Sequence, residues 1–373
     1  MRLLEITFTD PKLPGGVERL AIQLGEFLTK SSIQVSYMYS GDKNQIFYEN
    51  GVKKIILKCN KKFFPKIMFN IKVYLHVKNH KSDYDIIHIN GDNGDLVTAF
   101  KNIKTIMTVH GIALRDGLSM RGDKSVKTLT KLYKLAWAYI SNFFEIYAIK
   151  RAGVIATTSN VYLDFIKFHR KKEDAIVIMS GVDTNFFHPG NKKKVREELS
   201  LDENGIYGIW VGQEPKRKRL DFSIELIEET GLNLICIGNT ITDKRCSNRI
   251  SLLNNVDDEV LLKYYQAADF FLFPSVSEGF ALVIMEAMAC GAVPIIGENI
   301  KIPIMFDRRN CFIAKNESEF LKIIKEIDSN GSILAEMSEN AISSAKELSI
   351  QKNLSKYLEL ITNYYNHPKS NDK

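Results

Sequence analysis

The sequence contains few of the residues that mark metal-bound or disulfide-linked proteins. Only five of its 373 residues are cysteine. No two of them form a CxxC pair, and none has a histidine partner at zinc-ligand spacing. The sequence therefore predicts neither a zinc ribbon nor a disulfide framework, and it suits a reducing cytoplasm.

Long apolar runs are equally scarce. No run approaches the roughly 20 apolar residues that cross a bilayer. The N-terminus carries Glu5 inside its first apolar run and lacks a small-residue cleavage site, so it is typical of a first strand and not of a signal peptide. We expect a cytoplasmic protein whose only membrane contact is peripheral, on the inner face.

Acidic residues do not balance the basic ones in the first half of the chain. Up to Gly190 there are 28 basic and 17 acidic residues, whereas the remainder has 23 basic and 27 acidic ones. A positive first half favours an anionic partner such as a lipid headgroup or a nucleic acid. A solvated lysine-rich surface is the alternative. We expect no nucleic-acid partner, because charge is its only support.

The chain does contain a regular alternation of short apolar runs with longer segments of helical period. The runs are Leu3–Thr7, Val35–Tyr39, Ile55–Leu57, Ile86–Asn90, Thr105–Val109, Val154–Thr157, Ile176–Met179, Tyr207–Val211, Asn233–Ile237, Phe270–Pro274 and Val293–Ile296. Runs that are apolar on both faces and separated by helices are typical of a parallel sheet covered on both sides. The sequence therefore predicts an α/β protein with two Rossmann-like, doubly wound domains.

Turn residues between Gly181 and Gly190 mark the expected domain boundary. We assign residues 1–185 to the first domain and 186–349 to the second. A helix of about 350–366 is expected to pack back on the first domain, and 367–373 to form a disordered tail. Because ligands collect at the carboxyl ends of parallel strands, the cleft between the domains is the expected site.

Two glycines follow the first strand. Gly15 and Gly16 open a segment whose apolar residues recur at helical spacing. Glycines at a strand-to-helix turn let the backbone approach a ligand, and the free N–H groups of the helix start favour anionic oxygen. A tight structural turn is the alternative, because the pattern is neither GxGxxG nor a Walker A loop.

Four consecutive cations, Lys216 to Arg219, follow the strand that ends before Gly212. A phosphate leaving group gains negative charge as its bond breaks, and fixed cations in a dry cleft stabilise that charge in the transition state. Arginine binds phosphate in a bidentate manner, whereas lysine acts as a point charge. A solvated basic turn is the alternative.

Two carboxylates, Glu278 and Glu286, have seven residues between them and follow an apolar run. Glu278 is expected in a loop and Glu286 about two turns into a helix. An ionised carboxylate can accept two hydrogen bonds from a vicinal diol, such as a sugar or ribose edge. The alternative is a buried helix that ends at a Gly291 cap.

These residues make the chain resemble a family-four glycosyltransferase of the GT-B fold, also called glycosyl transferases group 1. The resemblance runs through nearly the whole chain, and the Glu-x7-Glu block is its most specific part. The matching stretches are Gly15–Glu18, Tyr84–His88, Thr108–Gly111, Ser180–Asp183, Val211–Gly212, Arg217–Lys218 and Glu278–Gly291.

The resemblance implies a reaction and a role for each site residue. It implies transfer with retention from a UDP- or GDP-sugar to a lipid-linked or surface glycan, with no obligatory metal, no cofactor and no protein nucleophile. Arg217 and Lys218 would bind the diphosphate, His110 would lie beside the sugar, Glu278 would bind sugar hydroxyls, and Glu286 would bind ribose hydroxyls. The donor-binding set is Gly15, Gly16, Gly212, Arg217, Lys218, Val256, Glu278, Gly279, Phe280, Ala281, Leu282 and Glu286, and the catalytic set is His110, Glu278, Arg217 and Lys218.

One departure from the family pattern affects the phosphate site. Many members have arginine where this chain has Gln213. Arg217 and Lys218 would still neutralise the phosphate, and Lys216 and Arg219 are expected to face solvent. The remaining alternatives are a sugar-nucleotide epimerase of the same fold and a non-catalytic sugar-nucleotide-binding protein. An epimerase would need a different acid-base set. A non-catalytic protein would have lost either the pair of glutamates or the pair of Arg217 and Lys218.

Two further features bear on partners. Asp83 and Asp85 spell a metal-binding Asp-x-Asp, but no second carboxylate cluster accompanies them, so we expect a strand-entry turn. The segments Lys61–Lys81 and Lys124–Tyr147 combine lysines with aromatic and apolar residues. Such segments suit an anionic membrane surface. The alternative is a core with solvated lysines.

Overall fold

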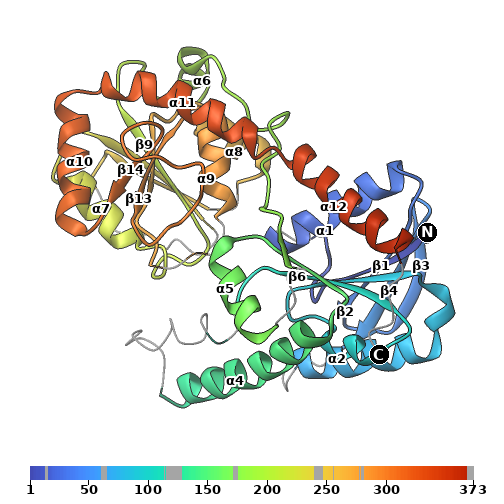
Figure 1. Ribbon diagram of the computed structural model, residues 1–373. Helices are drawn as coiled ribbons and strands as arrows, with labels where there is room; N and C mark the ends of the chain where they lie inside the picture. The colour runs from blue at the N-terminus through green and yellow to red at the C-terminus, as the bar shows by residue number, and fades with distance from the viewer. Residues whose placement is uncertain are drawn as a thin grey trace. The chain divides into compact units, whose positions relative to one another are not determined.

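The computed structural model describes residues 1–12, 16–59, 65–112, 114, 128–170, 175–238, 247–254, 256–276, 278 and 281–367. The chain divides into two compact units, Met1–Met179 with Asn353–Lys373, and Ser180–Lys352. Each unit has its own sheet and its own apolar core (Figure 1). The predicted α/β class with two parallel-sheet domains is confirmed. The tail expected after His367 lies outside the described residues.

The first unit is built on an eight-stranded sheet in the order β3-β4-β2-β1-β5-β6-β7-β8. Its strands are β1 (Arg2–Ile6), β2 (Gln34–Gly41), β3 (Gln45–Glu49), β4 (Val52–Lys58), β5 (Ile86–Asn90), β6 (Lys104–Val109), β7 (Val154–Thr157) and β8 (Ala175–Val177). All neighbours pair in parallel except β3 with β4. Strand β3 was not among the predicted runs, because this edge strand alternates between exposed and partly buried residues and has no continuous apolar run.

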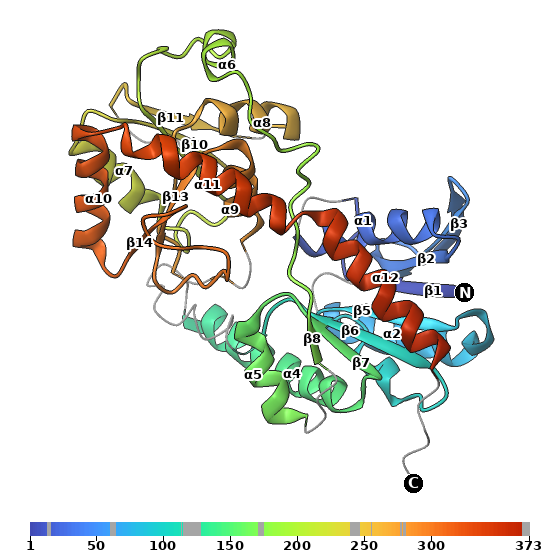
Figure 2. The ribbon, with the colours of Figure 1, turned by 45° about the horizontal axis from the view of Figure 1, so that its top comes forward.

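Helices cover both faces of this sheet. They are α1 (Gly16–Lys30), α2 (Pro65–Asn79), α4 (Thr128–Arg151), α5 (Asn160–His169) and α12 (Ile350–Asn366), with 3-10 turns η1 (Lys81–Asp83) and η2 (Asp95–Ala99). In both ribbon views α1 and α12 lie on one face, and α2 and α4 on the other (Figures 1 and 2). Side chains alternate along a strand. In β1, Leu4 and Ile6 therefore join the core under α2 and α4, while Glu5 points to the opposite face.

Helix α12 closes that opposite face. The ammonium of Lys104 donates to the carbonyl oxygens of Tyr364 at 2.9 Å and of Tyr365 at 2.5 Å. The hydroxyl of Tyr357, which is fully buried, lies 3.4 Å from that of Thr108 in β6. The last helix of the chain thus belongs to the core of the first unit.

The second unit is built on a six-stranded parallel sheet in the order β11-β10-β9-β12-β13-β14. Its strands are β9 (Tyr207–Val211), β10 (Asn233–Ile237), β11 (Ile250–Leu253), β12 (Phe270–Phe273), β13 (Val293–Gly297) and β14 (Phe312–Ala314). Its helices are α6 (Lys192–Glu198), α7 (Leu220–Glu228), α8 (Asp258–Ala267), α9 (Leu282–Cys290), α10 (Glu317–Ser329) and α11 (Ile333–Glu347). Helices α7 and α10 lie on one side of the sheet, and α8 and α9 on the other (Figure 1). The short strands β11 and β14 were not among the predicted runs.

Polar side chains fix where several of these helices begin and end. Asp257 caps α8 by accepting from the Val260 N–H at 2.8 Å. Asn316 caps α10 in the same way, from the Glu319 N–H at 3.1 Å. Gly291 ends α9 with φ of 92°, a left-handed conformation that favours glycine. The predicted Gly291 cap is therefore confirmed.

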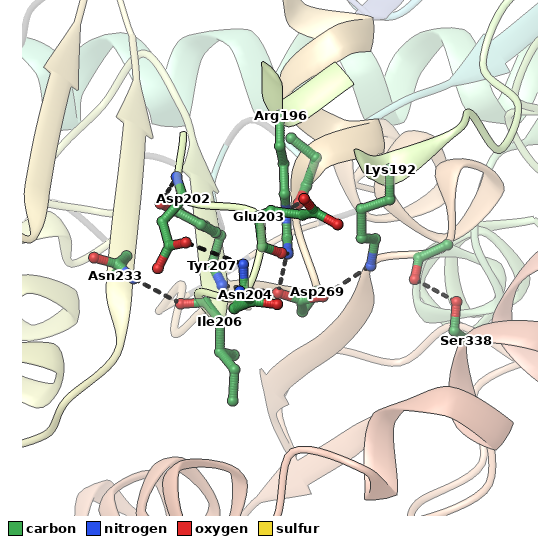
Figure 3. Close-up of polar contacts among 12 residues, drawn as sticks. Lys192, Arg196, Asp202, Glu203, Asn204, Ile206, Tyr207, Asn233, Asp269 and Ser338 are labelled. Carbon is green, nitrogen blue, oxygen red and sulfur yellow. Dashed lines mark hydrogen bonds and ion pairs between the residues drawn. The ribbon is translucent and has the colours of Figure 1, made fainter. Parts of the chain in front are cut away.

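An ion-paired cluster around Asp269 secures the amino-terminal edge of the second sheet (Figure 3). Asp269 accepts from Arg196 at 2.6 Å, from Lys192 at 2.8 Å and from the backbone N–H of Tyr207 at 2.8 Å. Arg196 is buried and also donates to the carbonyl of Ala267. Because Tyr207 begins β9 and Asp269 precedes β12, this cluster lies at the edge opposite the carboxyl ends of the strands.

Candidate active site

The loop after β9 carries the predicted phosphate-binding residues of the second unit. Arg217 donates to Glu278 at 2.7 Å and forms an ion pair with Glu214 at 2.6 Å. Burial acts to lower the pKa of Arg217, but the two carboxylates outweigh it and the pKa is raised. The Val276 N–H donates to the carbonyl of Arg217 at 3.0 Å, which ties this loop to the one after β12. The structure thus brings two predicted residues, Arg217 and Glu278, into contact.

Lys218 folds back over Gly212. A Cβ placed on Gly212 would lie 2.3 Å from Cδ of Lys218, so only glycine leaves room for this side chain. The ammonium lies 4.9 Å from the centre of the Phe273 ring. Burial lowers the pKa of Lys218, and the carboxylate of Glu278 opposes the shift. Lys218 is therefore a poorly hydrated cation within the field of Glu278.

Glu278 is held from two directions. Besides Arg217, the hydroxyl of Ser275 donates to it at 2.9 Å. The side-chain amide of Asn299 donates to the carbonyls of Ser275 and Val276 at 3.0 and 2.8 Å, which fixes the loop that precedes Glu278. The carboxylate is therefore oriented before any ligand binds.

Glu286 is a buried carboxylate within α9. The hydroxyl of Tyr265 donates to it at 3.3 Å. Since α9 begins at Leu282, Glu286 lies little more than one turn into the helix, not two as predicted. The difference arises because the helix starts later than its apolar pattern suggests, with Ala281 as its extended N-cap.

The structure describes some of the other predicted donor-binding residues. Gly16 is the first residue of α1, directly after the β1 connection, and Val256 lies directly before the α8 cap in the connection after β11. Both positions follow the carboxyl end of a strand. Gly15, Gly279 and Phe280 lie outside the described residues, and their predicted roles stay predictions.

Arg219, which was predicted to face solvent, is partly exposed. Its guanidinium is paired with Glu317 and lies 4.0 Å from the Phe222 ring centre. The backbone at Arg219 is left-handed, with φ of 55°, because this residue turns the loop into α7. Lys216 is exposed, as predicted.

His110 follows β6 at the carboxyl edge of the first sheet. Its Nε2 lies 3.3 Å from Oδ1 of Asn90, the last residue of β5. Burial, with a smaller effect of His88, lowers the pKa of His110 to about 3. The imidazole is therefore neutral at physiological pH.

A buried polar network lies behind His110 on the α1 and α12 face. Glu5 accepts from the side-chain amide of Asn90 at 2.6 Å, and its other carboxylate oxygen lies 2.8 Å from Nδ1 of His88. Nε2 of His88 lies 2.7 Å from the hydroxyl of Thr108. All four side chains are fully buried. His88 is a packed strand residue, as its position in an apolar run predicts.

The turn after β5 contains a carboxylate with an unusual environment. Asp92 forms an ion pair with Lys66 at 2.7 Å. Asp95 is fully buried, and neither of its carboxylate oxygens has a hydrogen-bond partner among the described residues. Burial, reinforced by Asp92 and Glu145, holds the pKa of Asp95 well above its usual range.

The described part of the chain offers neither a metal-ligand cluster nor a membrane-spanning helix. There, no group of three or more His, Cys, Asp or Glu side chains could hold a metal ion. Asp85 of the Asp-x-Asp spelling instead pairs with Arg2 at 2.8 Å. Within the same residues, no helix is both long enough and apolar enough to cross a bilayer.

Sequence reasoning missed the support for the site. In the first unit, one sequence feature could have indicated the buried network. Polar residues, namely Glu5, His88 and Asn90, occur in strands that are otherwise apolar. Glu214 and Ser275 gave no signal, because nothing in the sequence indicates which residues contact Arg217 or Glu278.

Two family models match the chain, one on each half. The model described as Glycosyltransferase Family 4 matches residues 14–186. The model described as Glycosyl transferases group 1 matches residues 191–348. Together they span nearly the whole chain.

Individual proteins of known sequence or structure are similar to this chain. The O-antigen biosynthesis glycosyltransferase WclY of Escherichia coli is 28% identical over 272 residues, 68% of this chain and 72% of that protein. The UDP-Gal:alpha-D-GlcNAc-diphosphoundecaprenol alpha-1,3-galactosyltransferase of Escherichia coli is 26% identical over 351 residues, 85% of this chain and 83% of that protein. The sucrose-phosphate synthase structure from Thermosynechococcus elongatus has a TM-score of 0.80 at 17% identity, covering 98% of this chain and 99% of that one.

Proposed function

Because the chain belongs to the glycosyltransferases of family 4 and group 1, with the GT-B fold, we propose that it transfers a sugar with retention from a UDP- or GDP-sugar to a lipid-linked or cell-surface glycan. The observation that carries the proposal is the contact of Arg217 with Glu278 at 2.7 Å, beside the poorly hydrated Lys218. This contact joins a phosphate-binding cation to a hydroxyl-binding carboxylate at one sheet edge.

The donor diphosphate binds Arg217 and Lys218. Both cations are positioned before the donor arrives, Arg217 by two carboxylates and Lys218 by its path over Gly212. Fixed charges in a poorly hydrated site favour the transition state, where negative charge grows on the leaving phosphate. These two side chains supply the charge neutralisation that we propose for a reaction without an obligatory metal.

The two glutamates bind hydroxyl groups. Glu278 accepts from the transferred sugar, and Glu286 accepts from the ribose. The orientation of Glu278 by Arg217 and Ser275 supports this role, since an oriented carboxylate loses little entropy on binding. The leaving phosphate takes the acceptor proton on the same face, so no side chain is assigned as nucleophile.

The first unit contributes the sugar contact of His110, the diphosphate contact of the Gly15-Gly16 turn and the acceptor site. The names of both Escherichia coli relatives, one for O-antigen biosynthesis and one with a diphosphoundecaprenol acceptor, support a glycan or lipid-linked acceptor. The nucleoside of the donor is tested by thermal unfolding with a panel of UDP-, GDP- and ADP-sugars.

We also propose peripheral docking of the first unit on the inner, anionic face of a membrane. On α2, Ile71 and Leu75 are exposed next to a groove of about 340 Å³ that Lys72 lines. On α4, Phe143 is 67% exposed. Exposed apolar side chains with lysines suit an anionic interface. Lys61, Lys62, Lys124 and Lys127 of the predicted basic segments lie outside the described residues.

Vesicle sedimentation tests the docking proposal. The protein is expected to sediment with phosphatidylglycerol-containing vesicles more strongly than with phosphatidylcholine vesicles, and Phe143→Ser is expected to weaken the binding. Equal sedimentation with both kinds of vesicle would refute an electrostatic contribution.

The donor site is tested by substitutions in the loop after β9 and in α9. Lys218→Ala is expected to lower kcat/KM for transfer about 100-fold to 1000-fold, because a preorganised transition-state contact is lost. Glu286→Gln is expected to raise the donor KM. Lys216→Ala is the matched control, since Lys216 is exposed in the same loop, and it should change kcat/KM by less than about twofold. Undiminished transfer by the Lys218→Ala or Glu286→Gln enzyme would remove that residue from the site, and a product of inverted anomeric configuration would refute retention.

A further inference from the structure

The buried network of the first unit leads from Glu5 to His110 through Asn90. Glu5 lies in β1, Asn90 ends β5 and His110 follows β6, so three neighbouring strands contribute one residue each. Glu5 and Asn90 have no exposed surface. A charged substrate could reach their contact only if the sheet opened. The network is therefore a permanent part of the fold.

The amide of Asn90 has one orientation in this network. Its Nδ2 donates to Oε1 of Glu5 at 2.6 Å and to the carbonyl of Ile6 at 3.3 Å. The backbone carbonyl of Ile6 can only accept, so the atom of Asn90 that faces it must be the N–H group. The Oδ1 atom of Asn90 must then face His110, whose Nε2 lies 3.3 Å away.

This orientation decides which nitrogen of His110 carries the proton. Since Oδ1 of Asn90 only accepts, Nε2 of His110 must donate to it. Burial keeps the imidazole neutral by lowering its pKa to about 3, so the ring has a single N–H. The lone pair is then on Nδ1.

We propose that Glu5, acting through Asn90, is a positioning residue that holds His110 in the Nε2–H tautomer, so that Nδ1 accepts a hydrogen bond from a hydroxyl of the transferred sugar. The part of this inference that concerns the sugar rests on the proposed function. The part that concerns the tautomer rests only on the contacts of the first unit.

The second branch of the network keeps Glu5 in place. Nδ1 of His88 lies 2.8 Å from the other carboxylate oxygen of Glu5, and its Nε2 lies 2.7 Å from the hydroxyl of Thr108. Tyr357 of α12 lies beside Thr108 and covers the His88 ring, with 5.9 Å between ring centres. This branch reaches α12 and does not touch His110, so it offers a control that is equally buried.

The tautomer is measured without any ligand. In the full-length protein with 15N-labelled histidine, long-range proton–nitrogen spectra distinguish the two neutral tautomers by their nitrogen shifts. We expect the Nε2–H pattern for His110 in the wild type. Asn90→Leu should give a mixture or the Nδ1–H form, because the acceptor of the Nε2 proton is absent. Glu5→Gln should shift the pattern in the same direction, because a neutral side chain holds the Asn90 amide less strongly than the wild-type contact does. Tyr357→Phe, the control on the other branch, should keep the wild-type pattern.

Transfer kinetics test the sugar contact separately. With the sugar nucleotide that gives the largest thermal shift, Glu5→Gln is expected to lower kcat about fivefold to tenfold, the worth of one hydrogen bond. The penalty should vanish for the donor analogue that lacks the contacted hydroxyl, tested first with the 6-deoxy sugar. A purely structural role of Glu5 would lower the rate equally for both donors.

Each outcome has a distinct meaning. An Nδ1–H pattern in the wild type, or an unchanged pattern in both Glu5→Gln and Asn90→Leu, would overturn the inference. If Glu5→Gln fails to fold, Asn90→Leu and Asn90→Ser report on the same contact. A shifted tautomer in a protein that binds none of the sugar nucleotides would refute the proposed function and leave the positioning role standing.

Discussion

The two units hold the polar groups at the carboxyl edges of their sheets by different means. In the second unit, Arg217 and Glu278 are ion-paired and belong to loops. In the first, Asn90 and Glu5 are hydrogen-bonded inside fully buried strands and present a neutral His110. The second unit thus fixes charged groups by ion pairs between loops, whereas the first fixes a neutral group by hydrogen bonds between strands. Under the proposed function, charge stabilisation falls to the second unit and geometric selection to the first.

The largest effect expected from this comparison lies at the far edge of the second sheet. Asp269→Ala leaves the buried Arg196 without its carboxylate, and breaking a buried ion pair costs about 3–5 kcal/mol. Urea denaturation of the second unit measures the loss in its free energy of unfolding. Lys192→Ala removes the more exposed partner of the same carboxylate and should cost less than about 1 kcal/mol. Equal losses of unfolding free energy in the two variants would show that the buried partner contributes no more than the exposed one.

A smaller effect of opposite sign is expected in the first unit. Asp95→Asn removes a buried carboxylate without a hydrogen-bond partner among the described residues, so it should stabilise by about 1–3 kcal/mol. Because the pKa of Asp95 is raised in the fold, the native state binds more protons than the unfolded chain above the ordinary carboxyl pKa. Stability attributable to Asp95 therefore falls as pH rises.

Chemical unfolding of the Asp95→Asn protein at pH 5 and pH 8 measures this dependence. The gain over the wild type should be larger at pH 8. A gain that is larger at pH 5, or a loss at both values, would mean that the carboxylate is stabilised as an anion. The first unit would then resemble the second in how it holds charge.

The smallest expected effect concerns the strained turn into α7. Arg219→Ala keeps a Cβ at a left-handed position and loses the contacts with Glu317 and Phe222. Arg219→Gly loses the same contacts but relieves the strain, so it should be about 1 kcal/mol more stable than the alanine variant. Thermal unfolding of the pair isolates the backbone contribution. Equal midpoints would show that the loop relaxes without cost.

The sequence predicted the inner strands better than the edges. β5 and β9 have the predicted bounds, because each is a short, mainly apolar run that is buried on both faces. β3 alternates in exposure, and β11 and β14 have only four and three residues, so none of them carries a clear apolar signal. Burial on two faces, and not strand propensity, made the prediction possible.

The sequence predicted which residues belong to the candidate site. It did not predict which of them contact one another. The pairing of Arg217 with Glu278 joins positions 61 residues apart, and only the strand order places their loops together. The contact of Arg219 with Glu317 was not predicted for the same reason, since Glu317 comes from a distant helix start. The link from Glu5 to His110 depends on the register of three strands, which apolar patterning leaves open.

The place of Tyr357 has a consequence for how the protein is made. The face of the first sheet that carries Glu5, His88 and Thr108 is covered by α12, which follows the strands and helices of the second unit in the chain. A nascent chain that has already folded the sheet of its second unit, but lacks α12, still exposes these strand residues to water. Completion of the first unit therefore waits for synthesis of the second, and a chain cut short before α12 would present an unfinished sheet to chaperones and proteases.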